Sequence, residues 1–276
     1  MSKRSIISDP RLVYALLALV VTVPILSHAV LPVPVSATTR AVFDFINRLP
    51  ANSLVVLSFD YSTSTVPELH PQAIVVTQHL FTRPVKIMFV AQWTDGPALT
   101  DAVLDAIEKG NKKYGVDYVM LGWIPNIATV IGMTANIAQF FPVDTLGNPT
   151  ASLPLIKEFP AGKKASLVIT FATGEPGLND YLQFWQAPFN IPVAVGSTAS
   201  GAPGYLPFYN SHQIVGILIS LRAAAEYEIL IGRIGLSGAI PAMVALSASH
   251  AMIVIVVVAA NVLFLLRRRK TAGDST

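Results

Sequence analysis

A long uncharged segment close to the C-terminus constrains this chain more than any other feature. Residues 243–266 contain no charged side chain, and three arginines and a lysine follow directly at 267–270. About 20 apolar residues suffice for a helix to cross a ~30 Å hydrocarbon core. Basic residues next to such a helix favour the cytoplasmic side. We therefore expect a transmembrane helix over 243–266 and a cytoplasmic tail over 267–276.

A second uncharged segment lies near the N-terminus, at residues 12–32. It predicts another transmembrane helix, preceded by a basic cytoplasmic tail at residues 1–11. The alternative is a secretory signal peptide that is cleaved after its small residues. Both interpretations place residues 38–234 outside the cytoplasm. We expect a two-pass protein of the cell membrane, with the lipid bilayer as its first partner.

The positive charge of the chain belongs to these flanks. The two tails hold seven basic and two acidic residues, whereas residues 38–234 hold twelve basic and fourteen acidic residues. The formal net charge of +3 therefore does not indicate a nucleic-acid-binding surface. The chain has no cysteine, which excludes disulfides and thiolate chemistry.

The central segment alternates between short apolar runs and helical patterns. Apolar runs typical of buried strands are centred on 53–60, 85–93, 117–124, 166–172 and 192–197. Helical patterns cover 40–49, 67–81, 96–114, 127–141, 177–187 and 211–231, and a loop rich in Pro and Gly covers 142–165. This alternation predicts an α/β domain with a five-stranded, mainly parallel sheet and helices on both faces. We favour the Rossmann-like strand order 3-2-1-4-5, with the flavodoxin-like order 2-1-3-4-5 as the alternative.

Ligands of open parallel sheets bind beyond the carboxyl ends of the strands, where the strand order reverses. That rule selects the following candidate ligand-binding residues: Asp60, Tyr61, Ser62, Thr63, Gln92, Trp93, Thr173, Gly174, Glu175, Ser197 and Thr198. In the favoured order, strands 1 and 4 are neighbours and Asp60 faces Glu175. Two such carboxylates can share a proton, bind a cation or hold a ligand hydroxyl. The alternative is that Asp60 caps the following turn and Glu175 is solvated.

Motifs for catalysis, metal binding and cofactors are missing. The sequence has neither a GxGxxG nor a Walker A pattern, and no GxSxG surrounds Ser197. The hydroxyl-rich loop 61–65 suits a phosphate or a sugar, but it lacks the glycines of a nucleotide pocket. No histidine pair has the spacing of a helical metal site. We therefore assign no catalytic residue, no metal and no cofactor.

The last predicted helix, 211–231, is apolar on almost every side in its first half. A helix of this kind is buried all round, so it needs a partner on the side that does not face the sheet. Gly216, Ser220 and Ala224 would form a narrow strip for close helix contact. They predict a homo-oligomer or contact with another membrane protein. The alternative is a core helix that the 142–165 loop covers.

The chain resembles an uncharacterised group of prokaryotic membrane proteins. The resemblance rests on the stretches SFDY at 58–61, GVDYVMLG at 115–122 and AAEYE at 224–228. It implies two terminal transmembrane helices that flank a Rossmann-like domain, and it implies no activity.

These features favour a membrane-anchored, non-enzymatic binding or assembly module, alone or as a subunit of a larger membrane complex. The alternative is a membrane-tethered hydrolase or transferase that acts on a sugar or envelope component with Asp60 and Glu175.

Overall fold

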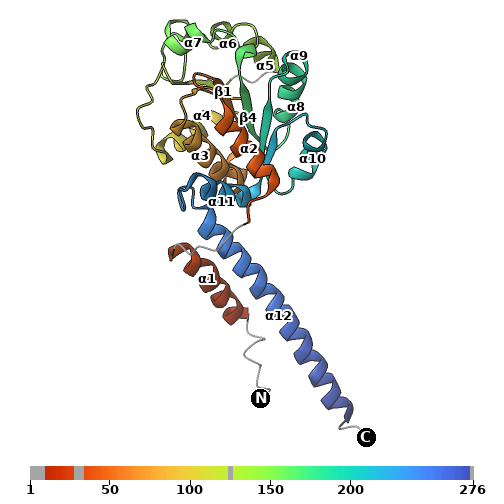
Figure 1. Ribbon diagram of the computed structural model, residues 1–276. Helices are drawn as coiled ribbons and strands as arrows, with labels where there is room; N and C mark the ends of the chain where they lie inside the picture. Colours follow the sequence, from red (N-terminus) through yellow and green to blue (C-terminus); the bar gives the residue numbers. More distant parts are fainter. Residues whose placement is uncertain (1–9, 28–33, 124–126, 274–276) are drawn as a thin grey trace. The chain divides into compact units, whose positions relative to one another are not determined.

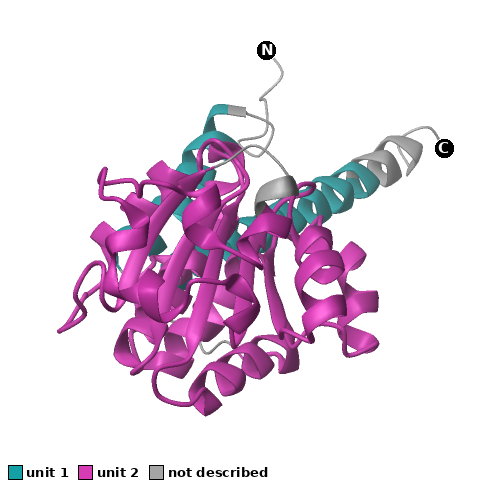
Figure 2. Ribbon diagram, turned by 90° about the horizontal axis from the view of Figure 1, so that it is seen from above, with its two compact units in different colours: residues 1–32, 240–276 teal, residues 33–239 magenta. Residues whose placement is uncertain are grey.

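The computed structural model describes residues 10–27, 34–123 and 127–273. The chain divides into two compact units, one of residues 33–239 and one that combines residues 1–32 with residues 240–276 (Figure 2). We describe each unit by itself.

The terminal segments contain one helix that is long and apolar enough to cross a membrane. This stretch, Ala239–Leu266, has 28 residues and belongs to α12 (Ala239–Gly273); it is the only such helix among the described residues. Helix α1 (Pro10–Leu26) has 17 residues and includes Pro24. At 1.5 Å per residue it reaches about 25 Å, less than a ~30 Å hydrocarbon core. The predicted C-terminal transmembrane helix is therefore supported by length and composition, whereas a second transmembrane helix over 12–32 is not confirmed.

The central unit is built on one parallel sheet of six strands in the order β3-β2-β1-β4-β5-β6. The strands are β1 (Leu54–Asp60), β2 (Lys86–Ala91), β3 (Tyr118–Trp123), β4 (Leu167–Ala172), β5 (Val193–Ser197) and β6 (Gly216–Ile219). The predicted α/β class and the Rossmann-like order of the first five strands are confirmed. The flavodoxin-like alternative is wrong, and the sheet has one strand more than the sequence predicted.

Strand β6 replaces the first half of the last predicted helix. Residues 216–219 pair with β5, and only Ser220–Ile231 form a helix, α11. A short apolar run fits a buried strand and a buried helix equally well by periodicity, and the β-branched residues here favour the strand. The helix before it, α10 (Ala202–Asn210), has no counterpart in the prediction.

Helices cover both faces of the sheet, as predicted. On one face lie α2 (Ala37–Arg48), α3 (Val66–Thr82), α4 (Gly96–Ala106) and α11. On the other lie α5 (Ile127–Met133), α6 (Ile137–Phe140), α8 (Leu178–Tyr181), the π-helix Leu182–Gln186, α9 (Ala187–Phe189) and α10. Figure 1 shows α3 and α4 on one side of the sheet and α8 and α10 on the other.

The segment predicted as a long loop, 142–165, contains three short helical turns. These are Thr150–Ser152, α7 (Pro154–Glu158) and Gly162–Lys164, and a further 3-10 turn, Thr63–Thr65, follows β1.

Alternation along the strands sends side chains to two apolar layers. Leu54 and Val56 of β1 pack into the core beneath α5 and α8, and Phe59 packs with Phe89 and Phe171 on the opposite face. All seven residues of β1 are buried, which is typical of a central strand in a parallel sheet. The carboxyl end of β1 is therefore fully buried, although its last residue, Asp60, is polar.

Candidate functional site

The strand order reverses between β1 and β4, so the crevice beyond their carboxyl ends is the expected binding position. Strand β1 ends in Asp60, which has no exposed surface. Ser58 precedes it by two residues and therefore lies on the same face of the sheet. The Tyr181 hydroxyl from α8 donates to the Ser58 hydroxyl at 2.8 Å. A polar cluster thus interrupts the apolar layer directly beneath the switch point.

Hydrogen bonds from several residues hold the Asp60 carboxyl group. The Gln92 backbone N–H donates to Oδ1 at 2.8 Å, and the Thr170 hydroxyl donates to Oδ2 at 2.7 Å. Burial nevertheless raises the pKa of Asp60 from 3.8 to about 6, because the hydrogen bonds, including one from Ser58, offset only part of the lost hydration. Asp60 does not cap the following turn. The Thr63 N–H donates instead to the Asp95 carboxylate at 3.0 Å.

The side chain of Gln92 lies beside this carboxyl group with its own polar atoms unpaired. It is 6% exposed, and neither Nε2 nor Oε1 has a hydrogen-bond partner within the part of the chain that the structure describes. Its side chain nevertheless lies within reach of Asp60 and Tyr181, because hydrogen bonding from it lowers the pKa of both groups, although burial raises both overall. A buried amide without partners costs about 1–3 kcal/mol. A ligand that pairs with it would remove that cost.

A hydrogen bond joins the loops on either side of β1. Trp93 follows β2 and Pro176 follows β4, and the Trp93 Nε1–H donates to the Pro176 carbonyl at 2.9 Å. Because β1 lies between β2 and β4, this hydrogen bond spans the carboxyl end of β1. We call it the Trp93–Pro176 bridge. It links the loops that follow the two neighbours of β1.

Glu175 and Tyr205 complete the arrangement. Glu175 is exposed and hydrogen-bonded to the Asn179 amide, and partial burial together with the charge of Asp180 raises its pKa. Burial raises the pKa of Tyr205, and the charges of Glu175 and Asp60 raise it further. Tyr205 is therefore within electrostatic reach of both carboxylates. We call Asp60, Gln92, Trp93, Glu175 and Tyr205 the switch-point site.

Tyr205 was not among the predicted residues, because it belongs to α10. The available signal was a helix start after β5, where Gly201 and Pro203 stand at the beginning of an apolar segment.

Other predicted residues serve the local structure. The buried Tyr61 hydroxyl pairs with His70 Nδ1 at 3.0 Å, and Ser62 pairs with Ser64. Thr173 donates its N–H to the Asp60 carbonyl, next to the half-buried Gly174.

The end of β5 is a capped turn. The Ser197 hydroxyl donates to the Thr198 carbonyl, and the Thr198 hydroxyl accepts from the Gly201 N–H. Ser197 and Thr198, which the sequence predicted as ligand-binding residues, therefore hydrogen-bond within a tight turn.

The three residues predicted for oligomer contact do not share an exposed helix face. Gly216 lies in β6, where an added Cβ would come 2.6 Å from Val42 Cγ2. Ala224 is fully buried in α11. Ser220 is the first residue of α11, where it has φ +57°, and its hydroxyl donates to Glu68 at 2.6 Å. The predicted helical strip is therefore wrong, and oligomerisation stays a prediction that needs another surface.

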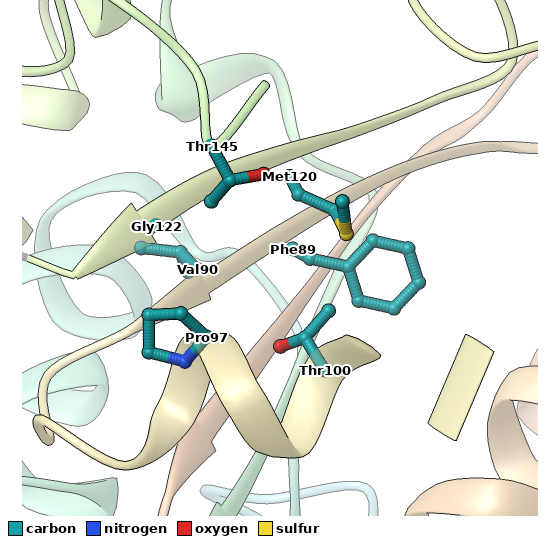
Figure 3. Close-up of a pocket in the computed structure, with 7 residues that line it drawn as sticks. All are labelled: Phe89, Val90, Pro97, Thr100, Met120, Gly122 and Thr145. Carbon is teal, nitrogen blue, oxygen red and sulfur yellow. The ribbon is translucent and has the colours of Figure 1, made fainter. Parts of the chain in front are cut away.

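A shallow hollow lies elsewhere, between the ends of β2 and β3 and the start of α4. It encloses about 180 Å³, open solvent included, and its lining residues are Phe89, Val90, Pro97, Thr100, Met120, Gly122 and Thr145 (Figure 3). Ligand pockets usually have about 300–1,000 Å³. This hollow is too small for such a ligand, and Asp60 does not line it.

Comparison with known proteins identifies no relative. No protein-family model, no curated protein and no solved structure matches this chain. The site must therefore be interpreted from its own chemistry.

Charge limits what the switch-point site can bind. The loops at 60–65, 92–95, 173–180 and 198–205 hold four acidic residues and no Lys, Arg or His. Among the described residues, no group of three His, Cys, Asp or Glu side chains could hold a metal ion. The arrangement offers carboxylates, an unpaired amide and aromatic rings, which are groups for binding rather than for phosphate recognition.

Proposed function

We propose that this protein is a membrane-anchored binding module whose ligand site is the switch-point site. The observation that carries the proposal is the buried Asp60 carboxyl group beside the buried Gln92 amide, whose polar atoms have no hydrogen-bond partner among the described residues. Buried polar groups without partners are rare in folded proteins, and a ligand is one of the few explanations for them. Their location at the reversal of strand order supports the same interpretation.

Binding accounts for this site better than catalysis does. An acid–base pair needs one carboxyl group free to exchange its proton with a substrate. Asp60 is held by hydrogen bonds from the Gln92 N–H, Thr170 and Ser58, and Glu175 is bonded to Asn179. The hydrolase or transferase alternative, which requires these two residues to act together, has no specific contact in its favour.

The membrane arrangement is part of the proposal. We infer a two-pass protein with both tails in the cytoplasm and residues 38–234 on the other side. The apolar helix Ala239–Leu266 and the basic residues at 267–270 support this orientation. Assembly with a second copy or another membrane protein would then run through the spans. The mass of the purified protein in detergent tests that assembly.

Cysteine labelling tests the topology cleanly, because the chain has no cysteine of its own. Leu146→Cys places a thiol on an exposed loop of the domain, and Ser275→Cys places one in the C-terminal tail. In intact cells, a membrane-impermeant maleimide should label the first variant and spare the second. Labelling of Ser275→Cys alone would show that the topology is the opposite of the one proposed.

A substitution at Asp60 tests the site. We expect a ligand from a small-molecule screen to raise the melting temperature of the full chain in detergent and to lose this effect with Asp60→Asn. Asp105→Asn, at an exposed position on α4, is the matched control. A ligand that stabilises all three proteins equally does not bind at the switch point.

A further inference from the structure

We infer that the edge of the sheet at the amino ends of its strands binds the anionic headgroups of the bilayer that anchors this chain. The inference starts from charge, which is nearly balanced over residues 38–238 but segregated within the fold. The segments at this edge hold ten basic and three acidic residues, whereas the rest of 38–238 holds two basic and eleven acidic residues. We call these segments the basic edge; they are 47–53, 82–86, 107–117, 157–166, 190–192, 210–215 and 232–238.

Hydrogen bonds join the segments of the basic edge into one surface. The Asn52 N–H before β1 donates to the Pro84 carbonyl before β2 at 2.7 Å, and the Asn52 amide donates to Glu158. The Leu155 N–H of α7 donates to the Gly115 carbonyl before β3 at 2.9 Å. The basic side chains are therefore gathered at one end of the strands, and the net charge of the domain conceals them.

Much of this positive charge is not neutralised by the protein. Five basic side chains of the edge are exposed and have no ion-pair partner within the described part of the chain: Arg48, Lys109, Lys113, Lys163 and Lys164. Burial lowers the pKa of Lys112; the charge of Asp117 opposes this shift and the charge of Lys86 adds to it. Like charges that are gathered in this way repel one another, which is typical of a surface that meets an anionic partner.

The loop that leads into the apolar helix Ala239–Leu266 belongs to the basic edge. Arg233 in this loop forms a two-pronged ion pair with Glu108, which follows α4, at 2.7 and 2.9 Å. Five residues separate Arg233 from the apolar helix. Six steps of about 3.5 Å limit this part of the edge to roughly 20 Å from the start of that helix. The chain itself therefore keeps the basic edge near the bilayer.

Apolar side chains among the cations favour lipid as the partner. Ile234 is 58% exposed and Val116 is 38% exposed, and they share loops with Arg233 and Lys113. Apolar side chains of this kind enter the headgroup region of a bilayer, where Lys and Arg meet anionic lipids. Nucleic acid is the other common anionic partner. The basic edge has no Trp and no exposed aromatic side chain on which bases could stack.

This inference rests on the membrane arrangement of the proposed function and does not use the switch-point site. All strands of the sheet are parallel, so the switch-point site and the basic edge lie at opposite ends of the strands. Lipid that binds at the basic edge therefore does not cover the switch-point site.

The test uses the full chain in vesicles of phosphatidylcholine, alone or with phosphatidylglycerol as one lipid in four. A fluorophore is attached to Val116→Cys at the basic edge or to Ser200→Cys beyond β5, since the chain has no cysteine of its own. A lipid with a nitroxide headgroup quenches fluorophores at the bilayer surface. We expect quenching of the Val116→Cys label that rises with phosphatidylglycerol and falls in high salt. The Ser200→Cys label should be quenched weakly in both lipid mixtures.

Lys163→Gln combined with Lys164→Gln tests the charge on a loop that does not carry the label. At the strength typical of basic residues beside an anionic bilayer, the loss of two charges should lower the ratio of bound to free domain about thirtyfold. The matched control combines Ala102→Glu with Gln183→Glu, two exposed helix positions outside the basic edge. It changes the net charge by the same amount and should leave the quenching nearly unchanged.

The remaining outcomes overturn the inference. Equal quenching of the Val116→Cys label with and without phosphatidylglycerol would mean that charge does not hold this edge at the bilayer. Stronger quenching of the Ser200→Cys label would mean that the opposite edge faces lipid. If the lysine pair is needed to bind a labelled single-stranded RNA and not for quenching, the partner is nucleic acid. A chain that does not enter vesicles would also refute the proposed membrane arrangement, whereas the other outcomes leave it standing.

Discussion

Replacing Asp60 with asparagine should make this protein more stable at neutral pH. Asparagine has the shape of the protonated acid. Its carbonyl can still accept from the Gln92 N–H, and its amide can donate to the Thr170 hydroxyl. What the substitution removes is a negative charge that the fold buries completely. The two hydrogen bonds stay and the cost of desolvating the charge disappears.

The size of the effect follows from the pKa. Burial raises the pKa of Asp60 from 3.8, the value expected in the unfolded chain, to about 6 in the fold. That difference corresponds to about 3 kcal/mol of lost stability at a pH where both states are ionised. One kcal/mol shifts the melting temperature of a domain of this size by about 2–4 °C, so the variant should melt roughly 6–12 °C higher.

The dependence on pH gives the sharper test. The folded state binds the Asp60 proton more tightly than the unfolded state does. The wild type should therefore gain stability as the pH falls from above 6 towards 3.8, and Asp60→Asn should not show this gain. The advantage of the variant should thus be largest near pH 8 and small near pH 4.

Melting curves of the full chain in detergent between pH 4 and pH 8 measure this difference, with Asp105→Asn as the control. If Asp60→Asn is less stable than the wild type by the same amount at every pH, the hydrogen bonds of the carboxylate outweigh its burial and the reasoning is refuted. A stabilising variant that also loses the ligand would be typical of a residue kept for function at the expense of stability.

Three further predictions concern other parts of the domain. Burial lowers the pKa of His79 from 6.5 to about 4, so this residue should make the fold less stable as the pH falls from 6.5 to 4. In the same melting experiment, His79→Gln should reduce the loss of melting temperature over this pH range. Gly216→Ala should destabilise the domain by about 1–3 kcal/mol in thermal melting, because the added Cβ meets α2 at 2.6–2.8 Å. The control Gly204→Ala, which has open space around it, should be neutral or slightly stabilising in the same measurement. The buried Glu228 carboxylate accepts three hydrogen bonds from the loop that precedes α12, so Glu228→Ala should speed tryptic cleavage after Arg233, measured by gel or mass spectrometry.

The sequence alone determined the features that depend on local patterns. Hydropathy identified the helix that is long and apolar enough for a membrane, because insertion depends on the summed transfer free energy of one continuous segment. Apolar runs located five strands, because the central strands of a parallel sheet are buried on both faces. Strand order and the rule for switch points then selected Asp60, Gln92, Trp93 and Glu175 without any motif.

Only the tertiary structure decided the rest. Residues 216–219 became a strand because an unsatisfied edge of β5 was available to pair with them, and no local signal reports that partner. Tyr205 joined the site because α10 places it where the charges of Glu175 and Asp60 raise its pKa. The raised pKa of Asp60, the unpaired amide of Gln92 and the Trp93–Pro176 bridge likewise depend on segments up to about a hundred residues apart. Burial and hydrogen bonding are properties of the assembled fold, so the sequence could name the residues of the site and could not give their chemical state.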